Sequence, residues 1–85
     1  MQKNIKLTSE QQLLVENNLS VVHWVIVNSI HVNPCIYGMS YEDLFQEGCI
    51  WLCRAAVTYN AAKALFSTYA KKVVRNGLIS YCRRQ

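Results

Sequence analysis

Residues 40–59 read SYEDLFQEGCIWLCRAAVTY, and this stretch predicts the amphipathic helix on which the fold depends. Ser40 is a favoured N-cap residue, and Asp43 stands where a capping box is completed. The predicted inward face recurs at helical spacing over Leu44, Gly48, Trp51, Leu52, Ala55 and Tyr59. A glycine in mid-helix costs about 1 kcal/mol relative to alanine. We therefore expect a neighbouring helix to approach closely at Gly48.

A second helix is predicted ahead of this one, at about residues 9–32. Its apolar residues follow at spacings of three and four, and it ends before Pro34, which disfavours helix in the residue ahead of it. Val21, Trp24 and Val27 widen its apolar stripe. A helix that is apolar over a wide arc is expected to be buried on more than one face.

A third helix is predicted at about residues 66–84. Its predicted core face is Phe66, Ala70, Val73, Gly77 and Tyr81. The expected fold is all-α, a compact three-helix bundle with or without an extra short turn, in one domain over residues 1–85. The single Pro and three Gly argue against disorder and against a turn-rich β fold.

The chain shows no sign of export, of membrane insertion or of catalysis. The apolar run at 19–30 is too short and too interrupted to span a membrane, and the first twelve residues are polar. Neither His23 nor His31 has an acid and a nucleophile at a catalytic spacing, and no phosphate-binding glycine loop is present. We expect a cytoplasmic protein with no membrane partner that is not an enzyme.

The cysteines are expected to be four free thiols. They are Cys35, Cys49, Cys53 and Cys82. None forms a Cys-x-x-Cys pair, and their spacing with the two histidines matches no zinc pattern. No metal and no other cofactor is expected.

Charge is distributed unevenly along the chain. Residues 63–85 carry six Lys or Arg and no acid, whereas residues 1–62 carry five acids and three basic residues. A basic end beside an acidic remainder favours two partners of opposite sign, with nucleic acid at the basic end. A solvated basic helix without a partner is the alternative.

Each of the last two predicted helices carries a candidate binding face. On the helix at 40–59 the candidate protein-docking residues are Asp43, Gln46, Glu47, Ile50 and Arg54. Polar groups around an apolar contact are typical of docking surfaces, although an ordinary solvated face is the alternative. On the helix at 66–84 the candidate nucleic-acid residues are Phe66, Thr68, Tyr69, Lys71, Lys72, Arg75, Asn76, Ile79 and Arg83. Cations beside aromatic rings suit single-stranded nucleic acid, because bases stack on the rings. The alternative places the aromatic side chains in the core; we expect this for Tyr81 and leave it open for Phe66 and Tyr69.

Three segments together resemble one protein family. Residues 41–48, YEDLFQEG, resemble the sigma factor signature in which an acidic-Asp-Leu is followed by Gln-Glu-Gly. FSTYA at 66–70 matches the second sigma signature at the right separation, and LVENNL at 14–19 looks like the opening helix of the same domain. The chain is therefore similar, over about residues 13–85, to region 2 of bacterial RNA polymerase sigma factors of the sigma-70 family, of the alternative type.

The resemblance implies a transcription initiation factor domain that binds core RNA polymerase and recognises and melts the minus-ten promoter element. It implies that Asp43, Gln46 and Glu47 dock on a basic coiled coil, the clamp helices, of the largest catalytic polymerase subunit. It also implies that the helix from Phe66 onward holds the unpaired non-template strand. An anti-sigma factor would be a further partner.

The chain also departs from the family pattern. Lys72 and Val73 stand where primary sigma factors carry two tryptophans, so a different or weaker melting device is expected. The connection at 60–65 lacks the usual acid-proline turn, and no domain for the upstream promoter element is present, which fits a fragment or a factor that relies on another protein. Two other interpretations are a stand-alone DNA-binding regulator resembling a helix-turn-helix protein, which would bind duplex tightly without polymerase, and a purely protein-binding helical domain.

Overall fold

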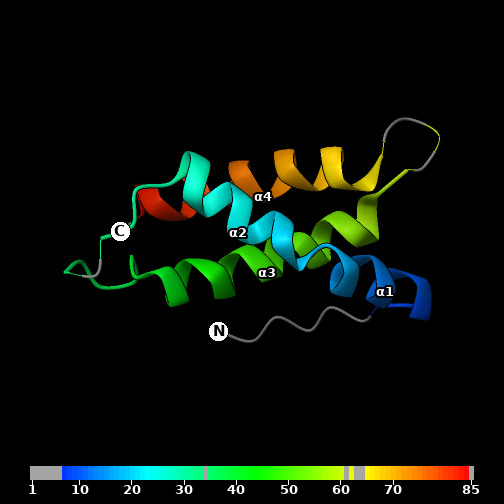
Figure 1. Cartoon of the computed structure of the whole chain (residues 1–85), viewed down its shortest axis with the longest axis horizontal. Coiled ribbons are helices and arrows are strands. Elements are labelled where there is room, and N and C mark those ends of the chain that lie inside the picture. The colour runs from blue at the N-terminus through cyan, green and yellow to red at the C-terminus, as the bar shows by residue number, and fades with distance from the viewer. Residues whose placement is uncertain (1–6, 34, 61, 63–64, 85) are drawn as a thin grey trace.

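Four helices form the bundle, in a computed structural model that describes residues 7–33, 35–60, 62 and 65–84. In chain order they are α1 (Ser9–Asn17), α2 (Leu19–Ser29), α3 (Tyr41–Thr58) and α4 (Phe66–Arg83). The long helices α3 and α4 run antiparallel, α2 crosses between them, and α1 lies toward the end of α3 that leads into α4 (Figure 1). No strand occurs in these ranges, so the all-α prediction is confirmed.

The prediction of one helix at 9–32 is wrong, because the chain forms two helices there. The break falls at Asn18, whose backbone is non-helical and whose side-chain amide donates to the Leu14 carbonyl at 2.8 Å. Asparagine side chains compete with the backbone for hydrogen bonds, which explains a break at this residue. The second piece ends at Ser29, ahead of Pro34, which lies outside the described residues.

The helix starts follow local hydrogen bonding. At α1, the Thr8 hydroxyl accepts from the Gln11 N–H and the Gln11 side chain accepts from the Thr8 N–H, which completes a capping box. At α3, the Ser40 hydroxyl accepts from the Asp43 N–H and donates to its carboxylate. These caps fix where the two helices begin, and the start of α3 agrees with the prediction from the sequence.

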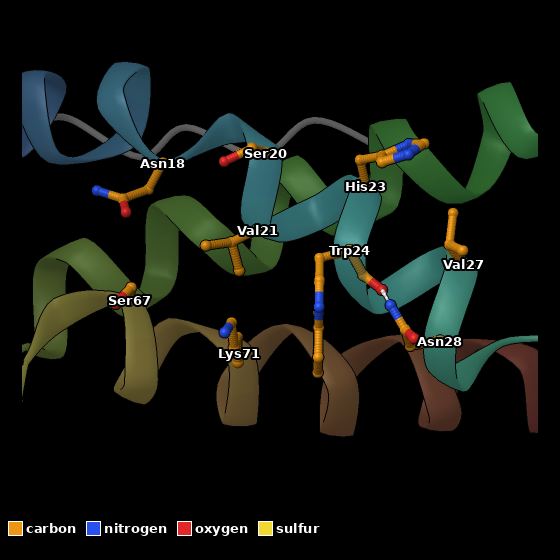
Figure 2. Close-up of a pocket in the computed structure, with 9 residues that line it drawn as sticks. All are labelled: Asn18, Ser20, Val21, His23, Trp24, Val27, Asn28, Ser67 and Lys71. Carbon is orange, nitrogen blue, oxygen red and sulfur yellow. Dashed lines mark hydrogen bonds between the residues drawn. The ribbon is translucent and has the colours of Figure 1, made fainter.

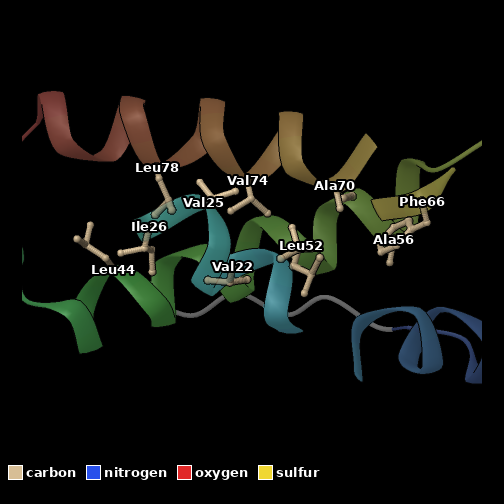
Figure 3. Close-up of a cluster of buried hydrophobic side chains, with 12 residues drawn as sticks. Val22, Val25, Ile26, Leu44, Leu52, Ala56, Phe66, Ala70, Val74 and Leu78 are labelled. Atoms are coloured by element: carbon tan, nitrogen blue, oxygen red, sulfur yellow. The ribbon is translucent and has the colours of Figure 1, made fainter. Parts of the chain in front are cut away.

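The core lies where α2, α3 and α4 meet (Figure 3). Its largest fully buried side chains are Val22, Val25, Ile26, Leu44, Leu52, Val74 and Leu78. On α4 the inward face also includes the fully buried Val74 and Leu78, which the prediction left out, whereas the predicted Val73 and Tyr81 pack against the core from half-buried positions. The reason is that α2 packs on α4 beside α3, which turns the buried arc toward Val74. Tyr81 is half-buried, and its hydroxyl donates to the Gly38 carbonyl at 2.9 Å.

Close helix contact at Gly48 is confirmed. A Cβ atom there would lie 2.5 Å from Cγ1 of Val22, so only glycine leaves room for α2 against α3. Among the described segments, no helix combines the length and apolar character needed to cross a bilayer.

Candidate functional site

The candidate docking surface runs along α3 and is called the α3 stripe: Asp43, Gln46, Glu47, Ile50 and Arg54. Gln46 and Arg54 are exposed, and Asp43, Glu47 and Ile50 are half-buried. Helical spacing therefore does bring the predicted side chains to one accessible face.

Two carboxylates of the α3 stripe are held by neighbouring side chains. Asp43 accepts from the Ser40 hydroxyl at 2.8 Å, and Glu47 accepts from the Trp51 indole N–H at 3.1 Å. The Arg54 guanidinium lies over the Trp51 ring, 4.7 Å from its centroid. The charged groups of the stripe thus have defined positions before any partner binds.

An aromatic cluster that was not predicted from the sequence lies beside the α3 stripe. Tyr41 stacks on Phe45 with ring centroids 6.0 Å apart, and the Tyr41 hydroxyl lies 2.6 Å from Nδ1 of His23. The cluster borders a hollow of about 380 Å³ lined by Tyr41, Glu42, Asp43, Phe45 and Gln46. Tyr41 and Phe45 stand four apart on one helical face, and this spacing could have predicted their contact. Nothing in the sequence predicted that His23 of α2 would reach Tyr41.

The basic face of α4 is accessible at most of its predicted positions. Exposed are Thr68, Lys72, Arg75, Asn76 and Arg83, and half-buried are Tyr69, Lys71 and Ile79. Lys72, which stands at a position where the resemblance to primary sigma factors would give a tryptophan, is exposed. The face therefore presents cations and small polar groups, with Ile79 on its margin.

The two aromatic side chains left open by the sequence differ in the structure. Phe66 is 6% exposed and packs edge-to-face on Tyr59 at 5.1 Å, so in this arrangement it is a core residue and its face is not open to a base. Tyr69 is half-buried, and its hydroxyl shares a hydrogen bond of 2.7 Å with Thr58. The Tyr69 ring also lies tilted against Tyr59, with centroids 6.0 Å apart, so Tyr69 packs on the core while part of its surface stays exposed.

A groove of about 530 Å³ lies between α2 and α4 (Figure 2). Its lining residues are Asn18, Ser20, Val21, His23, Trp24, Val27, Asn28, Ser67 and Lys71. Figure 2 shows Trp24 extending from α2 toward α4, where the Lys71 ammonium sits 4.4 Å from the centroid of its ring. The groove thus combines an aromatic ring, a cation and hydrogen-bonding side chains.

Trp24 is the main residue of this groove for which the prediction of burial, made from the sequence, is wrong. It is 45% exposed and Val27 is 63% exposed, so α2 is not buried on these sides as expected. A four-helix domain of this size has too few helices to enclose one of them completely. The surplus of apolar residues on α2 was the signal that an exposed apolar surface would remain.

The cysteines do not gather into a metal centre. Cys35 is exposed, and Cys49, Cys53 and Cys82 are half-buried free thiols. Burial raises the pKa of each half-buried thiol, and Cys53 adds to the rise at Cys49. Within the described residues no cluster of His, Cys, Asp and Glu could hold a metal ion.

Comparison with known proteins settles the family. Residues 14–85 match the family model described as Sigma-70 region 2. The chain belongs to the sigma-70 region 2 family. The resemblance drawn from the two signatures is therefore confirmed.

A curated relative supports the same family for this sigma region 2 domain. RNA polymerase sigma factor sigB of Arabidopsis thaliana is 34% identical over 87 aligned residues, covering 96% of this chain. The chain spans 15% of the length of that relative. No solved structure matches the domain significantly.

Proposed function

We propose that this domain docks on core RNA polymerase through the α3 stripe and holds the unpaired non-template strand of a minus-ten promoter element on α4 and the adjoining groove. The observation that carries the proposal is the groove in which Trp24 of α2 meets Lys71 of α4 beside the basic face. It adds an aromatic surface that the charge pattern alone does not supply.

The chemistry of the groove suits a single strand better than a duplex. Phosphates of a single strand or of a duplex would pair with Lys72, Arg75 and Arg83, and the affinity that such contacts give falls steeply as the salt concentration rises. Stacking on an aromatic ring needs an exposed base face, which only an unpaired base offers. Ser67, on the first turn of α4, and Lys71 add hydrogen-bond donors within reach of such a base.

The α3 stripe suits a basic protein partner. Its two carboxylates are held by Ser40 and Trp51, so less side-chain freedom is lost on binding than with free acids. Ile50 lies between the two acids and Arg54 along the stripe, and it offers the partner an apolar contact. A basic coiled coil of the largest polymerase subunit has the complementary charge.

Charge reversal on the α3 stripe tests the docking. Glu47→Lys places a cation against the basic partner, so affinity for core polymerase is expected to fall about tenfold or more. The matched control is Glu16→Lys, the same charge change at an exposed position of α1. The measurement is retention on immobilised core polymerase, with circular dichroism to check the helices. Wild-type retention of Glu47→Lys would contradict the docking proposal.

The competing function is a stand-alone regulator that binds duplex DNA. It requires tight duplex binding by the isolated domain, whereas the proposed role requires core polymerase for strong DNA binding. An electrophoretic shift of duplex DNA with and without polymerase separates the two.

A further inference from the structure

Trp51 contacts two oppositely charged residues of the α3 stripe, Glu47 and Arg54. Its indole N–H donates to the Glu47 carboxylate at 3.1 Å, and the Arg54 guanidinium lies 4.7 Å from its ring centroid. Glu47 and Arg54 stand two helical turns apart, one turn on either side of Trp51. A single side chain therefore positions an acid and a base of the surface proposed to bind polymerase.

The indole is itself fixed by α4. A Cβ atom on Gly77 would overlap the ring atoms Cγ, Cδ2 and Cε2 of Trp51, so the α4 backbone lies directly against the indole. Gly77 is buried, and Trp51 is half-buried. The place of the ring, and with it the places of Glu47 and Arg54, depends on how closely α4 packs on α3.

We propose that Trp51 is a positioning residue for polymerase docking, holding the Glu47 carboxylate and the Arg54 guanidinium in the arrangement that the partner recognises. This inference rests on the proposed docking function of the α3 stripe. A half-buried indole used only for packing would leave its N–H to water, and it would contribute equally whatever residue stood at 47. Instead, the Trp51 ring contacts Glu47 through its N–H edge and Arg54 through its face.

A double-mutant cycle tests this role. Trp51→Phe keeps an aromatic ring against Gly77 but removes the N–H donor. Alone, it is expected to weaken binding to core polymerase about threefold to tenfold, the size of the net contribution of one typical hydrogen bond. In a Glu47→Ala background, the same substitution is expected to have little further effect, because its partner is gone. Thermal unfolding of all four proteins, by circular dichroism, checks that each is folded at the temperature of the binding assay.

The outcomes separate the inference from the function on which it rests. Equal losses from Trp51→Phe in both backgrounds would show a packing role only and overturn the inference. Wild-type affinity for Trp51→Phe, with weak binding by Glu47→Ala, would also overturn it while leaving the docking surface intact. Wild-type affinity for Glu47→Ala would overturn the docking proposal and this inference together.

Discussion

Asn18 shows how one side chain redirects a helix that the apolar pattern would continue. Its amide bonds the Leu14 carbonyl, and the chain leaves the helical conformation for a single residue before α2 begins. The break bears on the proposed function, because Asn18 and Trp24 then line the same groove with Lys71. The spacing of apolar residues does not show that the Asn18 side chain competes with a backbone N–H for the Leu14 carbonyl, so the break could not be predicted from it.

The cysteine thiols give a prediction at the level of single residues. Thiolates are the reactive form, and burial raises the pKa of Cys49, Cys53 and Cys82. We expect iodoacetamide at neutral pH to label the exposed Cys35 first and the other three slowly. Peptide mapping by mass spectrometry measures the order, and unfolded protein, in which the four should react alike, is the control. Labelling of Cys82 as fast as Cys35 would contradict the prediction.

The same shifts set the pH dependence of stability. A pKa raised in the folded state means that the native protein holds the proton more tightly than the unfolded chain. The thiol contribution is therefore complete below the unfolded pKa of about 8.5 and declines as pH rises above it. Burial, with Asp43 and Glu47 nearby, also raises the pKa of Tyr81, which extends the decline above about pH 10.

Among the helices, the contact of α2 with α3 at Gly48 gives the clearest stability prediction. Gly48→Ala gains about 1 kcal/mol of helix propensity, but the new methyl meets the fully buried Val22 side chain. Overpacking costs about 1–3 kcal/mol, so we expect a net loss of about 1 kcal/mol and a melting temperature lower by about 4–8 °C.

Shortening the opposing side chain is the control for that prediction. In a Val22→Ala background the contact is relieved, and Gly48→Ala should then raise the melting temperature relative to Val22→Ala alone. A rise in the wild-type background would show that α2 yields freely at this contact.

The long helices could be predicted from the sequence and the arrangement between them could not. Ser40 and the periodic apolar residues set α3 to within a residue at each end. On α4, Val74 and Leu78 follow Ala70 at intervals of four, so spacing allowed either Val73 or Val74, and which of the two is fully buried depends on where α2 lies. Likewise, the stripe residues on α3 follow from periodicity, whereas the Trp51 contact with Gly77 joins helices that only the tertiary fold brings together.

For the molecule as a whole, one small core supports two proposed binding surfaces of different chemistry. Apolar residues of α2, α3 and α4 fill the shared core, which leaves the α3 stripe and the basic face of α4 free to meet partners. The contact of Trp51 with Gly77 packs α3, which carries the stripe, directly against α4, which carries the basic face. The two proposed partners, core polymerase and a DNA strand, would thus bind separate faces of one bundle.

The most direct test compares the affinity of the core-polymerase-bound domain for one A·T-rich promoter fragment in two forms, fully paired and with an unpaired central stretch. Fluorescence anisotropy of labelled DNA measures both. We expect the unpaired form to bind more tightly, and Trp24→Ala, which removes the exposed ring of the groove, to reduce that preference by about 1–3 kcal/mol, the value of one stacked base, while duplex affinity stays the same. Equal affinity for the two forms, or tight duplex binding that needs no polymerase, would contradict the role proposed for this domain.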